Sequence, residues 1–134
     1  MQIAQEIIKI FTGWIKIKVR LHVLSRGPYF KAGEIWWASI GQNVGVESNG
    51  KSKGFERPVL ILKKFNKDML LAIPVSTKIK EDQYKVIFIN NNKKYSANLS
   101  QMRVLDSKRL LRMVAKISNF DFMEVKRIYH EVVK

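Results

Sequence analysis

Cysteine is absent from this chain of 134 residues, and histidine occurs only twice. The lack of cysteine excludes disulfide bonds, thiolate metal ligands and cysteine nucleophiles. Two histidines without cysteine also argue against a zinc site. The 11 acidic residues are scattered, and the sequence contains neither a glycine-rich phosphate-binding loop nor a serine–histidine–aspartate set. An enzyme built from this chain is therefore expected to use no metal and no cofactor.

Long uninterrupted apolar stretches are also missing. The N-terminal sequence MQIAQEIIKIFTGWIKIKVRLHVL is rich in apolar residues, but charged residues interrupt it at Glu6, Lys9, Lys16, Lys18 and Arg20. A membrane-spanning helix needs about 18 consecutive apolar residues. A secretory signal needs a basic start, an apolar centre and a small-residue cleavage site. Neither pattern is present, so we expect a cytoplasmic protein without a membrane partner.

Acidic residues are few relative to basic ones, because 25 lysines and arginines face 11 aspartates and glutamates for a net charge of +14. This excess predicts attraction to polyanions, with nucleic acid as the first candidate and acidic protein segments or anionic membranes as others. Lysine spread evenly over the surface is the alternative. The length and the 46% hydrophobic content predict one folded domain. We treat residues 1–30 as an N-terminal extension packed on residues 31–134.

Two kinds of hydrophobic pattern follow one another along the chain. Residues 1–12 have helical spacing, whereas residues 15–23 alternate and fit either a strand or an irregular continuation of the helix. A loop rich in glycine, asparagine, serine and lysine occupies residues 41–56. Short strands are predicted around it, at residues 33–40, 58–64, 69–76, 84–89 and 95–99. Such strands, separated by turns, are typical of a small antiparallel sheet or barrel.

The C-terminal part is more helical. Asp106 can cap a short helix at residues 107–112, and a brief strand is predicted at residues 113–117. Ser118 and Asp121 resemble a capping box, and the apolar face that follows predicts a final helix. The predicted fold class is therefore mainly β with appended helices.

One arginine stands at the beginning of the most apolar strand. In GFERPVLILKKFN, Arg57 immediately precedes Pro58 and the four large apolar residues Val59–Leu62. Such a run without alternation predicts a strand buried on both faces. A guanidinium rarely leaves water. Arg57 is therefore either a surface residue beside a core strand or a charge that a rigid strand end holds over a substrate.

Other candidate residues lie in the strands around it. Pro74 interrupts LLAIPVSTK, and because proline cannot donate to a sheet it marks an edge strand or a bulge. Ser76 and Thr77 follow at the strand end, as ordinary turn hydroxyls or as part of a site. Trp36 and Trp37 can stack on bases, but alternation lets at most one of them face a given side.

Taken together, these segments resemble the MazF/PemK family of toxin endoribonucleases from toxin–antitoxin systems. The resemblance covers roughly residues 33–133. It rests on GEIWWASIG, on Gly45 and Glu47 in VGVES, and on ERPVLIL, IPVSTKI and LSQMRVLDSKRL in this order. The region through GPYF is similar to the extension of longer PemK-like members. The resemblance implies a small SH3-like antiparallel β-barrel of the CcdB/MazF kind, working as a homodimer.

The resemblance also implies a function and its residues. The implied activity is metal-independent cleavage of single-stranded RNA, with neutralisation by a cognate acidic antitoxin. The catalytic arginine of the family corresponds to Arg57, and its catalytic threonine to Ser76, or to Thr77 after a slip of one residue. The implied RNA-binding residues are Glu47, Gln101 and Arg103, and basic residues placed to contact the RNA backbone are Lys51, Lys53 and Lys78.

This sequence departs from the family pattern at two places. Serine stands at position 76 where the family usually has threonine, and the segment between Glu47 and Arg57 is longer than in compact members. Glu47 is a candidate general base, and solvent is the other. Two alternative functions are a CcdB-like toxin that binds DNA gyrase and a non-catalytic RNA-binding barrel. RNA left intact in a cleavage assay favours either of these alternatives.

Overall fold

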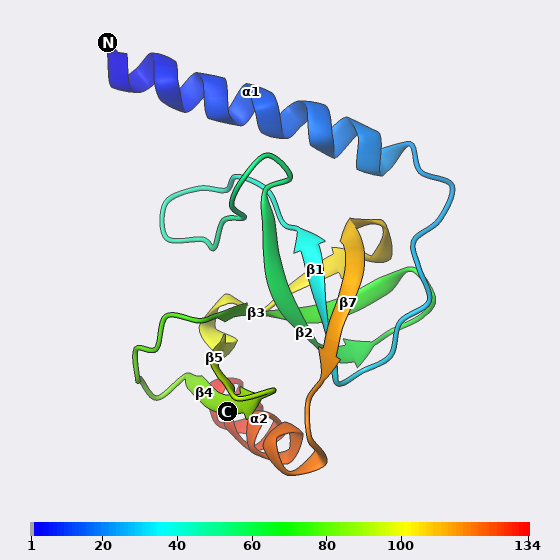
Figure 1. The fold of residues 1–134 in the computed structure, drawn as a ribbon, viewed down its shortest axis with the longest axis vertical. Coiled ribbons are helices and arrows are strands. Elements are labelled where there is room, and N and C mark those ends of the chain that lie inside the picture. Colours follow the sequence, from blue (N-terminus) through cyan, green and yellow to red (C-terminus); the bar gives the residue numbers. More distant parts are fainter. Residues whose placement is uncertain (1) are drawn as a thin grey trace.

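The computed structural model describes residues 2–134 (Figure 1). A long N-terminal helix precedes a series of strands, and a second helix ends the chain. The elements are α1 (Gln2–His22), β1 (Glu34–Ser39), β2 (Glu56–Lys64), β3 (Met69–Ser76), β4 (Lys85–Asn90), β5 (Lys93–Asn98), η1 (Leu99–Gln101), β6 (Arg103–Asp106), η2 (Ser107–Arg109), β7 (Leu110–Lys116) and α2 (Asn119–Val132). The predicted fold class, mainly β with appended helices, is confirmed.

The strands form one antiparallel, strongly curved sheet. Its order is β4-β5-β3-β2-β1-β7, and β6 pairs with β3 beside this path. Within residues 2–134, β4 and β7 do not pair with each other, so the barrel is not closed. The two helices lie at opposite ends of the molecule (Figure 1). Helix α1 crosses one end of the sheet near β1 and β2, and helix α2 packs against β4 (Figure 1).

The core consists of side chains from the apolar runs that the sequence indicated. Val59, Leu60 and Ile61 of β2 are fully buried, as expected of a strand with no polar face. They divide between two clusters, one on each face of the sheet. Leu60 packs with β3, β4, β5 and α2 residues, whereas Val59 and Ile61 pack with β1, β6 and β7 residues.

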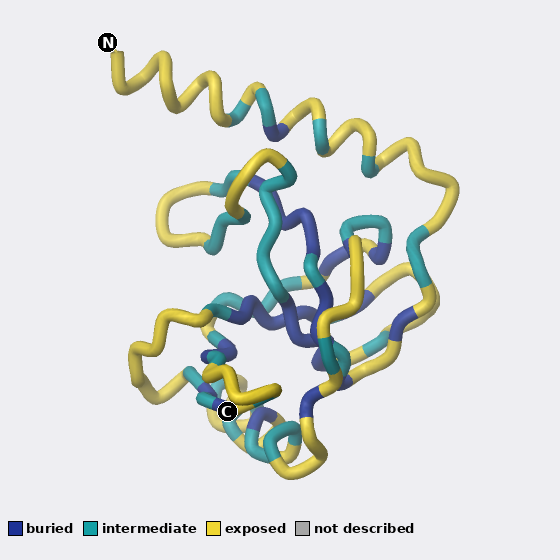
Figure 2. The backbone as a smooth tube through the Cα atoms, in the orientation of Figure 1, coloured by how far each residue is buried: buried dark blue, intermediate teal, exposed yellow. Residues whose placement is uncertain are grey.

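Residues 2–22 of the extension form one continuous helix, α1, so residues 15–22 are helical and not a strand. Their alternation has a physical reason: α1 contacts the barrel along a narrow line, and most of its apolar side chains stay exposed (Figure 2). Trp14 is the one buried residue of α1. Its ring lies 5.7 Å from that of Phe55, and it occupies the space beside Gly41 that a Cβ atom would fill.

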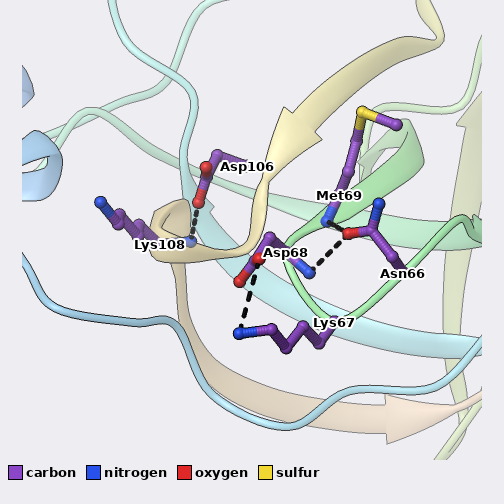
Figure 3. A network of polar contacts seen from close by, with 6 residues as sticks. All are labelled: Asn66, Lys67, Asp68, Met69, Asp106 and Lys108. Carbon is purple, nitrogen blue, oxygen red and sulfur yellow. Dashed lines mark hydrogen bonds and ion pairs between the residues drawn. The ribbon is translucent and has the colours of Figure 1, made fainter.

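A polar network fixes the turn between β2 and β3 (Figure 3). The side-chain oxygen of Asn66 accepts the backbone N–H groups of Asp68 at 2.8 Å and of Met69 at 3.0 Å. Asp106 accepts the N–H of Lys108 at 2.8 Å and caps η2. The backbone N–H of Ser107 then donates to the carbonyl of Asp68 at 2.8 Å, which joins this turn to the start of η2.

The predicted helix at residues 107–112 is wrong. It is a single 3-10 turn, η2, and Leu110 already begins β7, which pairs with β1 over Leu110–Lys116. Strand β6 was also not predicted. SKRLLR has good helix formers, but pairing with β1 overrides that local preference. The capping box before α2 is confirmed, because the Ser118 hydroxyl accepts the N–H of Asp121 at 3.1 Å.

Pro74 lies inside the sheet, not on an outer edge strand, and the β2–β3 bulge falls between Ile61 and Lys63. On one side Pro74 pairs with Val59. On its other side the pairing with β6 ends at Ala72 and the pairing with β5 begins at Val75. Pro74 thus falls in a gap between two partners, where a residue without an N–H is tolerated.

Within residues 2–134, no helix is both long enough and apolar enough to cross a membrane. This holds for α1 as well, because lysine and arginine interrupt its apolar residues.

Candidate functional site

The predicted catalytic residues lie together in one cavity of about 370 Å³, which we call the central cavity. It opens between β2 and β3, with walls from β1, β5 and β7. Arg57, Ser76, Thr77 and Lys51 all line it. The residues that complete the lining are Ile35, Trp37, Ser52, Glu56, Pro58, Val75, Lys93, Tyr95, Arg112 and Val114.

The register of β2 and β3 explains why Arg57 and Ser76 lie on the same cavity. Val59 pairs with Pro74 in antiparallel order. Continuing this register for two residues brings Arg57 opposite Ser76. At this point β3 turns to β5 and Ser76 pairs with Ser96, so β2 and β3 part and the cavity opens between them.

The guanidinium of Arg57 is held from one side by the long loop. Its Nε–H donates to the carbonyl oxygen of Asn49 at 2.7 Å, and the residue is half-buried. Burial lowers the pKa of Arg57, because the protein removes part of the water that solvates the charge. The group nevertheless stays protonated, because arginine hardly deprotonates in proteins. The guanidinium of Arg57 is therefore a partly desolvated cation with a fixed orientation at the beginning of β2.

The two hydroxyl candidates differ in their surroundings. Ser76 ends β3, and its Oγ accepts the backbone N–H of Lys78 at 3.1 Å. Thr77 lies outside the strand and is exposed. Ser76 also lines a second cavity of about 210 Å³ together with Arg57, Lys78, Lys80 and Lys85, which we call the lysine cavity. Arg57 and Ser76 thus form the wall between two cationic hollows.

Three predicted RNA-binding residues lie elsewhere. Glu47, Gln101 and Arg103 line a third cavity of about 390 Å³, the glutamine cavity, with Asn43 and Ser48. Glu47 accepts the N–H of Val44 at 2.9 Å and so closes its own turn. The structure does not bring Glu47 into the central cavity.

Gln101 organises the long loop. Its Oε1 accepts the N–H of Ser48 at 2.9 Å, and its Nε2 donates to the carbonyl of Val46 at 2.9 Å. These two bonds join residues more than fifty positions apart and place the loop next to Arg57 through Asn49. Lys53, by contrast, is exposed in this loop and lines none of the three cavities.

No pattern in the sequence indicated that several residues of the central cavity belong to the candidate site. Lys93 and Tyr95 come from β5 and Arg112 from β7, and no motif connects these residues. The guanidinium of Arg112 lies 5.2 Å from the centre of the Trp37 ring and 3.0 Å from the carboxylate of Glu56. Trp37, one of two tryptophans considered for base stacking, is thus the one that reaches the cavity, whereas Trp36 is buried in the core.

The cavity lining is strongly basic. Lys51, Arg57, Lys93 and Arg112 face a single carboxylate, Glu56. Within residues 2–134, His, Cys, Asp and Glu side chains form no group of three or more that could hold a metal ion. The guanidinium, amines and hydroxyls of this lining can bind an anion. The aromatic rings beside them can stack on a planar group.

Comparison with known proteins identifies relatives of this architecture. Residues 31–133 match the model of a family described as PemK-like, MazF-like toxins of type II toxin–antitoxin systems. The crystal structure of MazF from Deinococcus radiodurans is similar with a TM-score of 0.66 at 22% identity, over 79% of this chain and 97% of that chain. No curated protein matches the chain significantly.

Two further solved structures are complexes with antitoxins. An endoribonuclease from mycobacterial species in complex with its cognate antitoxin has a TM-score of 0.61 at 12% identity, over 80% of this chain and 95% of that chain. The MazE–MazF complex from Deinococcus radiodurans has a TM-score of 0.61 at 20% identity, over 79% of this chain and 96% of that chain. At these identities the structures share the fold.

Proposed function

The chain belongs to the family of PemK-like, MazF-like toxins of type II toxin–antitoxin systems, and on this premise we propose that it is an endoribonuclease that cleaves single-stranded RNA without a metal. One observation carries the proposal: Arg57 and Ser76, distant in sequence, line the same cationic cavity. A guanidinium and a hydroxyl on rigid strand ends suit a reaction in which negative charge develops on a phosphate.

RNA contributes its own nucleophile. The 2′-oxygen forms a bond to the adjacent phosphorus while the bond from phosphorus to the 5′-oxygen breaks. The 2′-hydroxyl proton is lost, and the departing 5′-oxygen gains a proton. The products are a 2′,3′-cyclic phosphate and a 5′-hydroxyl. The protein therefore has to position the phosphate and stabilise its charge, and no metal-bound water is needed.

In this proposal, Arg57 binds the scissile phosphate with its forked donors, and the hydroxyl of Ser76 donates to a phosphate oxygen. Thr77 lines the same cavity from outside the strand and is the alternative hydroxyl. The proton acceptor is better assigned to Glu56 than to Glu47, because Glu56 lines the central cavity and Glu47 holds its own turn.

The remaining cations define a path for the RNA backbone. Lys51 lies in the central cavity and Lys78 in the lysine cavity, on either side of Arg57. Gln101 and Arg103 line the glutamine cavity, where bases can be read. Lysines of this kind position a nucleic acid and carry little sequence information themselves.

Two protein partners belong to the proposed function. One is a cognate acidic antitoxin, which competes with RNA for the basic surface, as suits a chain of net charge +14. The other is a second copy of the chain. Strand β7 is an outer strand of the sheet, and its Leu111, Met113 and Val114 are 39–46% exposed, which supports a homodimer through this edge.

The test is cleavage of a mixed RNA followed by analysis of the fragment ends. We expect fragments that carry a 2′,3′-cyclic phosphate or a 5′-hydroxyl, in EDTA as well as in magnesium. RNA with a 2′-deoxy nucleotide just upstream of the cut should resist. A 5′-phosphate product, or activity that EDTA abolishes and magnesium restores, contradicts the mechanism. Intact RNA contradicts the function.

A further inference from the structure

Helix α1 leaves an apolar groove open at its side. The groove has a volume of about 540 Å³ and lies between α1 and the first residues of the long loop. Its apolar side chains are Phe11, Trp14, Ile15 and Val19. Ile15 and Val19 are 58% and 56% exposed, although they are aliphatic residues of a helix that already packs on the barrel. We call this hollow the helix groove.

The direction of the groove decides which kind of partner fits. Residues advance by about 100° around a helix, so Lys9 and Lys16 point away from Trp14 and hence away from the barrel. Ile15 points sideways, about 100° from Trp14, and Val19 lies about 140° from Trp14 on the same flank, where both line the angle between the helix and the loop. A flat bilayer resting on the far side of α1 would therefore meet Lys9 and Lys16 with Val19 at their margin, whereas Ile15 lies at the side. A narrow segment of a protein can enter the angle and bury the aliphatic side chains.

The charge around the helix groove indicates which protein segment can bind there. Lys18 lines the helix groove, and none of the described residues that line it is acidic. A second copy of this chain would bring its own positive charge to the groove. An amphipathic segment with acidic residues beside its apolar ones is complementary to it.

The helix groove also continues into the proposed RNA site. Asn43 lines both the helix groove and the glutamine cavity. Its side-chain nitrogen donates to the carbonyls of Ile40 at 3.1 Å and of Ser48 at 2.8 Å, which makes the ridge between the two hollows rigid. A segment that covers the glutamine cavity can therefore cross Asn43 and reach α1.

The match to the family model begins at residue 31, so α1 lies outside the part of the chain that the family shares. We propose that the helix groove is a second docking site for the cognate antitoxin, which a segment with apolar and acidic residues occupies after it crosses the RNA site. Because α1 is an addition to the shared fold, this contact discriminates the cognate antitoxin from antitoxins of relatives that lack the helix. The proposal rests on the proposed toxin function.

The test measures binding of the full chain to the protein encoded by the gene adjacent to its own. The variant is Ile15→Ser with Val19→Ser, which removes the aliphatic side chains without changing the charge, and the matched control is Ile89→Ser, a 61% exposed isoleucine of β4. We expect Kd to rise about 100-fold in the double variant, or tenfold for each aliphatic side chain replaced, and to stay within about twofold in the control. RNA cleavage and thermal unfolding should match the wild-type chain.

The outcomes separate the two proposals. An unchanged Kd in the double variant, with tight binding by the wild-type chain, overturns the docking site and leaves the toxin function standing. No binding by the wild-type chain overturns the docking site and this antitoxin partner, whereas the endoribonuclease function is decided by the RNA cleavage assay. The docking site is also overturned if the wild-type chain alone forms larger assemblies that the double variant breaks, or if it floats with vesicles of equal parts phosphatidylcholine and phosphatidylglycerol and the double variant does not.

Discussion

The Nε–H of Arg57 donates to the carbonyl oxygen of Asn49 at 2.7 Å, so the loop before β2 orients the guanidinium at the head of that strand. The same loop is held at its other end by Gln101. Strand β2 fixes the backbone of Arg57 and the loop fixes the orientation of its guanidinium, so the proposed chemistry depends on both.

Replacing Arg57 by alanine should lower the cleavage rate about 100- to 1,000-fold, the usual effect of removing one preorganised donor to a developing charge. Arg57→Lys should be nearly as inactive, because lysine keeps the charge but has neither the forked donors nor the bond to Asn49. Single-turnover cleavage of a short RNA measures both variants, with circular dichroism to verify the fold. A lysine variant with wild-type activity would show that charge alone suffices.

Ser76→Ala should reduce cleavage more than Thr77→Ala. A hydrogen bond to a charged phosphate stabilises by about 1.5–3 kcal/mol, or roughly 10- to 100-fold in rate. Ser76 ends β3 and lines both the central cavity and the lysine cavity with Arg57, whereas Thr77 is exposed beyond the strand end. Side-by-side kcat measurements decide the order. The reverse order would assign the phosphate contact to Thr77.

Glu56→Gln should lower kcat by at least about 100-fold if this carboxylate accepts the 2′-hydroxyl proton. Glutamine keeps the size of the side chain and can still accept a bond from Arg112, so the fold should be unaffected. Glu47→Gln is the matched control, because Glu47 lines a different cavity. Equal activity of the two variants would leave proton removal to solvent.

Lys51→Ala and Lys53→Ala should differ in the salt dependence of RNA binding, although both residues are exposed in one loop. Lys51 lines the central cavity and Lys53 lines none of the three. Removing one lysine that binds a phosphate should make the slope of log K against log salt shallower by about 0.7 for single-stranded RNA. Titrations at several salt concentrations with catalytically inactive Arg57→Ala protein measure it. Parallel slopes for both variants would remove Lys51 from the RNA path.

Local sequence patterns were sufficient to predict most strands, and the family resemblance supplied the roles proposed for two strand ends. The apolar run after Arg57 predicted a buried strand, and the end of the next strand was predicted at Ser76 and Thr77. These signals are local, because strand burial and strand ends are determined by neighbouring residues. The catalytic roles themselves stay predictions.

Long-range pairing explains what the sequence did not reveal. Helix formers at residues 107–112 indicated a helix, but β1 offered Leu110 and Arg112 a partner strand. Tyr95 and Arg112 reach the central cavity through the order of β5 and β7 around β2 and β1, which no local pattern encodes. The alternation in residues 15–23 was ambiguous because a helix that is mostly exposed has no strict apolar side.

The close fit between Trp14 and Gly41 makes the packing of α1 depend on a glycine of the barrel. Gly41 has φ +92°, and a Cβ atom there would collide with the Trp14 ring. Glycine is needed at position 41 for two reasons, because its positive φ disfavours any other residue and because the Trp14 ring leaves no room for a Cβ atom. The dependence therefore runs in one direction: a lineage can gain or lose Trp14 with the helix, whereas the glycine that makes room for it stays under the constraint of its own backbone.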